Sequence, residues 1–249
     1  MEEFLATAAH DLRTPLAAAV GFIDLAERHT VQLADAVREK YPALASRVQA
    51  VRGQLDDASE SAERLSRLLT RLFDTAAIRA GKLELHRAPC DLVALVREQV
   101  AGLRVAAPNR TIRVHLPADG EPIPVEVDAD RIGQVVANYA TNALKYSPPD
   151  RPIDVSVSAH GSRARVAVCD QGLGIPTEEQ TRVWELFHRA PGVTTQGATL
   201  AGTQGGSLGL GLHISRAIIM AHNGRVGVKS AVGEGTTFWF TLPLAGGTR

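Results

Sequence analysis

The sequence predicts an α+β protein in two parts: an antiparallel helical hairpin over residues 1–81, then an α/β sandwich over residues 82–249. Two long apolar seams at helical spacing, joined by a short turn that contains a proline, predict the hairpin. The sandwich is predicted by a change of pattern beyond residue 81, where short alternating strands are mixed with capped helices. A chain of 249 residues is long enough for two modest domains, each with its own core.

The hairpin is predicted from apolar residues that recur at alternating steps of three and four. The first helix is expected over residues 3–40, and Pro42 suits the first turn of the second. Gly81 is a suitable helix stop. Two helices alone cannot bury both seams on all sides, so we expect the hairpin to dimerise into a four-helix bundle. The seam positions are Leu5, Ala9, Leu12, Leu16, Ala19, Ile23, Ala26, Leu33 and Val37, then Leu44, Val48, Val51, Leu55, Ala58, Ala62, Leu65, Leu69, Leu72 and Ala76.

The second part is predicted to mix strands with three helices. Asp91 can cap a helix over residues 92–105, and Asp128 can cap one of roughly 18 residues that ends at the Ser147 breaker. A third helix is expected over residues 208–222. The glycine- and threonine-rich residues 190–206 have the composition of a mobile loop. Strands are expected at residues 82–86, 111–116, 125–127, 153–158, 163–169, 225–230 and 236–242.

Composition excludes several classes of protein. The 27 basic and 27 acidic residues give a net charge of zero, which argues against a nucleic-acid binder. The two cysteines, Cys90 and Cys169, are far apart in the sequence, so a disulfide scaffold or a cysteine-based zinc site is not expected and a reducing compartment fits. No apolar run approaches the ~20 residues that span a bilayer. We therefore expect no membrane segment in this chain.

One histidine of the first helix stands out. His10 lies roughly 90° or more from the centre of the apolar seam, and Thr14, one turn on, shares its outward face. Asp11 is its neighbour in sequence. Near pH 7 an imidazole with a pKa of ~6.5 is largely neutral and can act as a nucleophile. An ordinary surface histidine would give the same pattern, and so the surrounding motif has to decide.

The helix that follows Asp128 carries groups suited to a metal–phosphate ligand. Asn138, Asn142 and Lys145 can face the same way. Amide oxygens are hard ligands that suit Mg²⁺, and lysine suits a phosphate as a point charge. The alternative is a solvated helix face.

Two glycine-containing stretches could contact a ligand. Asp170-Gln171-Gly172-Leu173-Gly174 places a carboxylate at a strand end, where it could accept a hydrogen bond from the exocyclic amine of adenine. A tight turn would explain the same residues. Residues 205–212 enter a helix, and the free amides at a helix N-terminus favour phosphates. Neither stretch is a dinucleotide fingerprint or a GxxxxGK[ST] phosphate loop.

Together these motifs resemble the sensor histidine kinases of two-component systems, over residues 4–244. His10-Asp11-Leu12-Arg13-Thr14-Pro15-Leu16 resembles their phosphoacceptor box, which a plain coiled-coil spacer would not explain. The rest resembles the catalytic domain of the GHKL (Bergerat) ATPases, five segments of which occur in order: residues 130–147 (N box), 170–174 (first glycine box), 184–189 (phenylalanine box), 205–212 (second glycine box) and 233–238 (closing strand turn).

The resemblance implies ATP and Mg²⁺ as cofactors. By it, Asn142 is the principal Mg²⁺ ligand, supported by Asn138, and Lys145 and Arg189 contact phosphates. Tyr146 is implied to pack on the adenine, and Asp170 is implied to accept a hydrogen bond from the adenine amine. The glycines implied to shape the site are Gly172, Gly174, Gly209 and Gly211.

The resemblance also implies a relay. His10 takes the γ-phosphoryl group with Asp11 as the adjacent base, and an aspartate on a response-regulator receiver domain then receives it. Thr14 is implied to place water for dephosphorylation of the regulator. The homodimer would form through the hairpin. We expect a cytoplasmic location, either as a separate kinase or as the soluble part of a membrane-bound sensor.

The sequence departs from the family pattern at two positions, and three alternative functions remain open. His188 stands where the family has an aromatic residue, and Asn223 stands where it often has glycine. Residues 190–206 would form a long lid. The alternatives are a phosphatase-biased member that acts through Thr14, a degenerate kinase that serves as a dimeric scaffold or ATP sensor, and a GHKL ATPase of another branch, which would not need the His10 hairpin.

Overall fold

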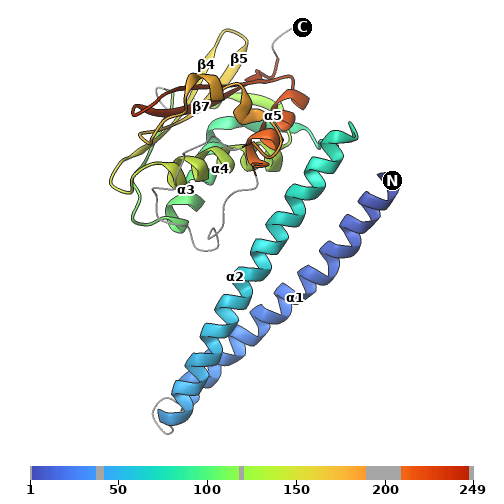
Figure 1. The fold of residues 1–249 in the computed structure, drawn as a ribbon, viewed down its shortest axis with the longest axis vertical. Helices are drawn as coiled ribbons and strands as arrows, with labels where there is room; N and C mark the ends of the chain where they lie inside the picture. The colour runs from blue at the N-terminus through green and yellow to red at the C-terminus, as the bar shows by residue number, and fades with distance from the viewer. Residues whose placement is uncertain (1, 38–41, 118–120, 189–208, 247–249) are drawn as a thin grey trace. The chain divides into compact units, whose positions relative to one another are not determined.

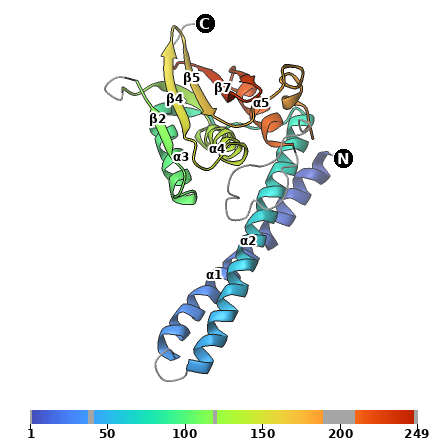
Figure 2. The ribbon, with the colours of Figure 1, turned by 60° about the vertical axis from the view of Figure 1, so that its left-hand side comes forward.

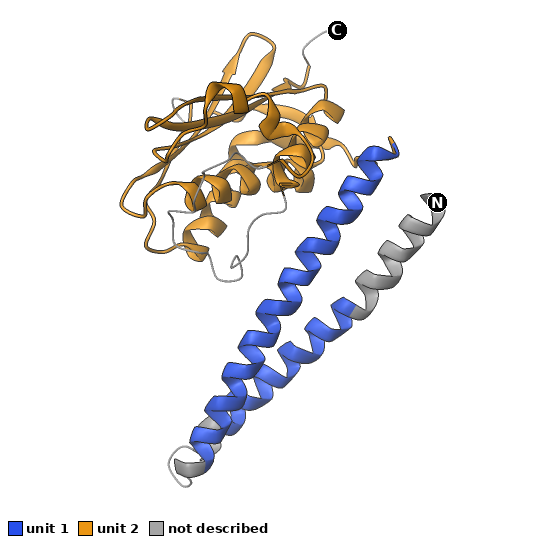
Figure 3. Cartoon of the chain, viewed as in Figure 1, with its two compact units in different colours: residues 1–80, 201–204 blue, residues 81–200, 205–249 orange. Residues whose placement is uncertain are grey.

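The computed structural model describes the backbone of residues 2–37, 42–117, 121–188 and 209–246, and their side chains except those of residues 2–15, 34–37, 42 and 43. The chain divides into two compact units, with the boundary between Ala80 and Gly81 (Figure 3). The predicted lid over residues 190–206 lies outside the described residues.

The first unit is a pair of long helices, α1 (Glu2–Val37) and α2 (Pro42–Arg79), shown in Figure 1. Pro42 opens the second helix, as predicted. The chain leaves α2 through Gly81, which has a φ of +67°. Glycine adopts this left-handed conformation without the steric penalty of a Cβ atom, so the predicted helix stop is confirmed. Within the described residues no helix is both long and apolar enough to cross a bilayer.

The seams of the hairpin are only partly covered within one chain. Val48 is buried, and Leu16, Ile23, Leu55 and Leu69 are half-buried. Other seam positions remain 43–54% exposed: Leu33, Leu44, Val51, Leu65 and Leu72. Apolar side chains at regular helical spacing therefore face outward along both helices.

The second unit opens with β1 (Ala88–Asp91), α3 (Leu92–Ala106), β2 (Ile112–His115), β3 (Pro124–Val127) and α4 (Ala129–Tyr146). Both predicted caps are confirmed. The Asp91 carboxylate accepts a hydrogen bond from the N–H of Val93, and the Asp128 carboxylate accepts one from the N–H of Arg131.

The strand predicted at residues 82–86 was wrong. The first strand begins at Ala88 and pairs with β3. The backbone N–H of His86 is donated to the Asp128 carboxylate at 3.0 Å, and so it does not enter a strand ladder. A side chain 42 residues away competes for this donor, and alternation in sequence cannot reveal such a partner.

The main sheet has five strands in the order β2-β4-β5-β7-β6. Its other strands are β4 (Ile153–His160), β5 (Arg163–Asp170), β6 (Arg225–Ala231) and β7 (Gly235–Pro243). The β2–β4 pair is parallel and the remaining pairs are antiparallel. Helices α3, α4 and α5 (Gly211–Ala221) lie on one face of this sheet (Figure 2). The predicted α/β sandwich is confirmed.

The core lies between that face and the helices. Alternate residues of the central strands are buried, including Val155, Val166 and Phe240. From α4, Tyr139 is fully buried, and its ring packs 5.5 Å from Phe238 and 6.1 Å from Phe240, centroid to centroid. This packing fixes α4, the helix of the predicted N box, on the sheet.

The turn before β6 explains one departure from the family pattern. Asn223 has a φ of +57°, in the left-handed region. Asparagine tolerates this conformation better than most residues because its short polar side chain can bond locally. Asn223 therefore adopts the conformation for which glycine is usually chosen.

Candidate active site

The side chains of four predicted site residues lie outside the described part of the structure. His10, Asp11 and Thr14 lie within helix α1, but their side chains are outside the described residues, and Arg189 is outside them altogether. Their roles stay predictions. The remaining predicted residues belong to the second unit and can be placed.

Asn138 and Asn142 stand one turn apart on α4, and both are half-buried. The Nδ2 of Asn138 donates a hydrogen bond to the Oγ of Ser215 on α5, at 3.0 Å. Gly211, the first residue of α5, lies against the same amide, because a Cβ atom at residue 211 would overlap the side chain of Asn138. The N box and the second glycine box therefore meet where α5 begins.

Among the residues that the structure describes, no side chain caps the N-terminus of α5. Its first N–H groups are therefore available to an anion, as a phosphate site requires. Gly209, two residues earlier, has a φ of +68°, and a Cβ there would lie 2.7 Å from the carbonyl oxygen of His188. The helix begins three residues later than predicted, because Gly209 and Leu210 form the bend that leads into it.

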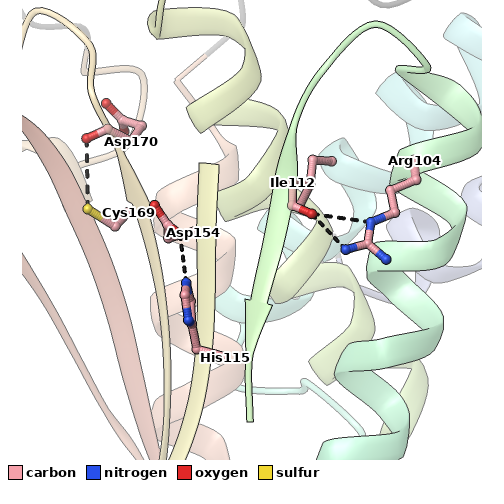
Figure 4. Close-up of polar contacts among 6 residues, drawn as sticks. All are labelled: Arg104, Ile112, His115, Asp154, Cys169 and Asp170. Atoms are coloured by element: carbon pink, nitrogen blue, oxygen red, sulfur yellow. Dashed lines mark hydrogen bonds and ion pairs between the residues drawn. The ribbon is translucent and has the colours of Figure 1, made fainter. Parts of the chain in front are cut away.

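Asp170 ends β5 and is 5% exposed. Its Oδ1 accepts a hydrogen bond from the N–H of Gly172 at 2.8 Å. Burial raises the pKa of this carboxyl group to about 6, although the N–H groups of Gly172 and Thr236 and the charge of Arg110 act in the opposite direction. The neighbouring Sγ of Cys169 donates to the backbone oxygen of Asp170 at 3.8 Å (Figure 4).

The first glycine box packs tightly against its surroundings. A Cβ atom at Gly172 would overlap the backbone oxygen of Tyr146, and one at Gly174 would overlap the backbone oxygen of Ala231. Gly174 also has a φ of +73°. Without these side chains, the loop can approach the C-terminal end of α4 at Gly172 and the end of β6 at Gly174.

Lys145 and Tyr146 occupy that end of α4. The Nζ of Lys145 lies 5.3 Å from the centroid of the Tyr146 ring, and both residues are half-buried. Tyr146 is thus in backbone contact with Gly172, which in turn is bonded to Asp170. The predicted adenine residues are therefore brought together.

The phenylalanine box is anchored through Trp184, whose ring meets Phe238 edge-on at 5.8 Å. His188 stands where the family has an aromatic residue. Its Nε2 pairs with the Oε2 of Glu179 at 2.5 Å, and each side chain is 10% exposed. Glu179 also accepts from Arg182 at 3.1 Å. Sequence reasoning missed Glu179, which no spacing rule connects to His188.

The site as a whole surrounds the C-terminal half of α4. The Asn138 amide lies toward α5, and the buried Asp170 carboxylate with Gly172 lies toward the end of the helix. A buried carboxylate beside a tyrosine suits a planar ligand with an amine donor. Amide oxygens near an uncapped helix start suit a phosphate with a hard cation. The donors present therefore fit an adenine nucleotide with Mg²⁺.

Family comparisons agree with this arrangement. Residues 1–81 match the His Kinase A (phospho-acceptor) domain. Residues 127–246 match the histidine kinase-, DNA gyrase B- and HSP90-like ATPase family. The two matches occur in the order expected from the motifs.

Curated relatives match along almost the whole chain. The probable sensor histidine kinase TcrY of Mycobacterium tuberculosis is 33% identical over 246 residues, which are 99% of this chain and 46% of TcrY. The sensor protein kinase WalK of Staphylococcus epidermidis is 28% identical over 243 residues, 97% of this chain and 36% of WalK. The chain thus spans less than half the length of these relatives.

Solved structures show the same fold. Full-length ShkA in complex with AMPPNP gives a TM-score of 0.66 at 29% identity, covering 98% of this chain and 46% of ShkA. The mycobacterial sensor histidine kinase MprB gives 0.53 at 26% identity, covering 64% of this chain and 98% of the MprB chain. With its phosphoacceptor domain followed by a GHKL-type ATPase domain, the chain belongs to the sensor histidine kinases of two-component systems.

Proposed function

We propose that the chain is an ATP-dependent protein-histidine kinase that phosphorylates His10 and passes the phosphoryl group to an aspartate of a response regulator. The observation that carries the proposal is the convergence of Asn138, Tyr146 and Asp170 around the C-terminal half of α4. These are the residues that the motifs assign to one nucleotide. The kinase ShkA, similar along 98% of this chain, has been solved with the ATP analogue AMPPNP.

In this proposal the predicted catalytic domain, residues 82–249, holds Mg-ATP. Asp170 accepts a hydrogen bond from the adenine amine, and Tyr146 packs on the base. Asn142 and Asn138 would hold Mg²⁺, and Lys145 and Arg189 would contact phosphates. When bound, Mg²⁺ would neutralise part of the negative charge of the phosphates. Gly172 and Gly174 shape the base end, and Gly209 and Gly211 lead into the helix start that faces the phosphates.

The predicted hairpin domain, residues 1–81, supplies the acceptor. A nitrogen of the His10 imidazole forms a bond to the γ-phosphorus as the bond to the bridging oxygen breaks and ADP leaves. The ring proton passes to Asp11. Positioning and charge neutralisation carry most of such a transfer, because the loose transition state needs little covalent help. Thr14 places the water that hydrolyses the aspartyl phosphate of the regulator and releases inorganic phosphate.

Dimerisation through the hairpin is supported by the exposed seam. Leu65 and Leu72 are 50% and 54% exposed in one chain. A second hairpin would cover such positions and give a four-helix bundle. Ala17, Ala18 and Gly21 are also exposed on α1, and their small side chains would let a receiver domain approach close to His10.

The decisive experiment is incubation with γ-labelled ATP and Mg²⁺. The label should be acid-labile and stable to alkali, as expected for a phosphoramidate. His10→Gln should abolish labelling but leave ATP affinity unchanged. His29→Gln is the matched control, since His29 is another exposed histidine of the same helix and should label normally.

Two results would contradict the proposal. Label that persists on histidine in His10→Gln would move the acceptor to another residue. If the wild-type chain binds ATP but takes up no label, the result would favour the alternative of a scaffold or ATP sensor.

A further inference from the structure

Arg110 is a buried arginine in the connection between α3 and β2. It is 8% exposed. Its Nη1 donates to the backbone oxygens of Leu144 and Ser147, at 3.3 and 3.2 Å, and its Nη2 donates to the Oγ of Ser147 at 2.6 Å. The last carbonyls of a helix have no partner within the helix, so these bonds satisfy the end of α4.

Ser147 completes this cap. Its Oγ donates to the backbone oxygen of Ala143 at 2.8 Å, and the residue is fully buried. The Nε of Arg110 is buried without a hydrogen-bond partner among the described residues. A buried N–H group without a partner carries a desolvation cost. The bonds from Arg110 to the end of α4 must offset this cost.

The residues between the capped carbonyls are Lys145 and Tyr146. The backbone of Tyr146 rests against Gly172, at the point where a Cβ would overlap it. The N–H of Gly172 is in turn bonded to the Asp170 carboxylate at 2.8 Å. A continuous set of contacts therefore leads from Arg110 through the end of α4 to the adenine end of the site.

We propose that Arg110 is a positioning residue of the nucleotide site: it fixes the last turn of α4 so that Tyr146 and the loop from Asp170 to Gly174 keep the geometry that receives adenine. This inference rests on the proposed nucleotide-binding function. Arg110 acts through these neighbours and is not itself assigned a contact with the nucleotide.

Charge supports the same role. Burial raises the pKa of Asp170 to about 6, and the nearby Arg110 charge opposes that rise. The other charged group that acts on Arg110 is Asp150, which with Asp170 raises the pKa of the guanidinium against the lowering effect of burial. Without the Arg110 charge the pKa of Asp170 would be higher still, and less of the carboxylate that accepts the adenine amine would be ionised near pH 7.

Two substitutions separate charge from geometry. Arg110→Lys keeps the positive charge but loses the planar fork that bonds three acceptors at once. Arg110→Met removes both. Arg104→Met is the matched control: Arg104 lies on α3, close in sequence, and its Nε and Nη2 donate to the Ile112 oxygen at 3.3 and 2.7 Å, but the residue is exposed (Figure 4).

The measurement is calorimetric affinity of the full chain for a non-hydrolysable ATP analogue between pH 5.5 and 8.5, with thermal unfolding in parallel. Wild-type affinity should fall as the pH drops through about 6, the pKa of Asp170. Arg110→Met should bind about tenfold or more weakly at pH 7, with the midpoint of the pH profile moved upward. Arg110→Lys should bind more weakly with its midpoint unmoved. Arg104→Met should match the wild type.

The outcomes are distinguishable. A wild-type chain that binds no adenine nucleotide would overturn the proposed function along with this inference. A wild type that binds, with Arg110→Met unchanged in affinity and midpoint, would overturn the role of Arg110 alone. Lower thermal stability with unchanged affinity of the folded fraction would make Arg110 merely structural. If Arg110→Met does not fold, the Arg110→Lys variant decides. An affinity equal to that of the wild type overturns the positioning role, and a weaker affinity supports it.

Discussion

The Nδ2 of Asn138 donates a hydrogen bond to the Oγ of Ser215 at 3.0 Å, although the two residues are 77 positions apart in the chain. Ser215 is 2% exposed, so this bond is shielded from water. It joins α4 to α5 one turn after Gly211, where α5 begins. The proposed Mg²⁺ ligand on α4 and the helix start proposed to face the phosphates are therefore fixed relative to each other.

Gly211→Ala tests this coupling. A methyl group at residue 211 would overlap the Asn138 side chain, so either that amide or the start of α5 must move. Alanine favours helix, so propensity would not weaken the protein. We expect ATP affinity with Mg²⁺ to fall about tenfold, and affinity without Mg²⁺ to change less. Calorimetry with and without Mg²⁺ measures both.

The control for that substitution is Gly102→Ala. Gly102 lies on α3, and a Cβ atom there meets nothing within 4 Å. It should bind Mg-ATP as the wild type does. Equal Mg-ATP affinity in Gly211→Ala and Gly102→Ala would show that the close approach of Gly211 to Asn138 has no bearing on the metal site.

Asp170→Asn should weaken nucleotide binding and stabilise the free protein. An amide presents one acceptor oxygen and no charge to the adenine amine, so we expect affinity to drop by roughly one to two orders of magnitude. Because the folded-state pKa of about 6 exceeds the ordinary 3.8, the native wild type binds the extra proton between these values. Its stability therefore falls as pH rises toward 6 and stays lowered above it.

The measurement is the free energy of unfolding of both proteins from pH 4 to pH 8, without nucleotide. The variant should gain on the order of 2 kcal/mol over the wild type at pH 8, and the difference should shrink on acidification. A difference that does not vary with pH would argue against the raised pKa of Asp170.

His222→Ala should destabilise the second unit. The Nε2 of His222 accepts a hydrogen bond from the N–H of Asp128 at 3.0 Å, and its Nδ1 donates to the Ile218 oxygen at 2.8 Å, so the buried ring is neutral. Its loss leaves a buried N–H unpaired and a cavity, at about 2–4 kcal/mol. His160→Ala, at the exposed end of β4, should be near neutral. Urea unfolding at pH 7.5 compares them.

The same histidine predicts a loss of stability in acid. Burial lowers the pKa of His222 from its ordinary 6.5, and the charge of Arg87 lowers it further, while the bond to Ile218 and the charge of Asp128 oppose this. The unfolded chain then takes up the proton first, so the stabilising contribution is lost as pH falls from 6.5 toward the lowered value. An identical pH slope in wild type and His222→Ala would refute this.

Leu72→Glu should weaken the proposed homodimer. Leu72 is 54% exposed in one chain and belongs to the apolar seam of α2. A carboxylate buried between two hairpins would be strongly unfavourable, and so dissociation should shift by about tenfold or more. Gln54→Glu adds the same single negative charge at an exposed position of the same helix and should leave the dimer intact. Light scattering over a concentration series gives the masses.

The sequence alone determined much of the architecture. The two seams predicted α1 and α2, strand alternation predicted the buried face of the sheet, and Asp91 and Asp128 marked the starts of α3 and α4. These features can be predicted from the sequence because each depends on residues within one or two turns of one another. The motif order likewise predicted that Asp170, Tyr146 and Asn138 share a site.

The tertiary structure decided the rest. Arg110 gives no signal in the sequence, because the carbonyls it caps are 34 and 37 residues away. The N–H of His86 is taken by Asp128, so the strand predicted there does not form. Which buried donor meets which acceptor is set only when distant segments pack, since desolvation then requires each polar group to find a partner that local pattern does not specify.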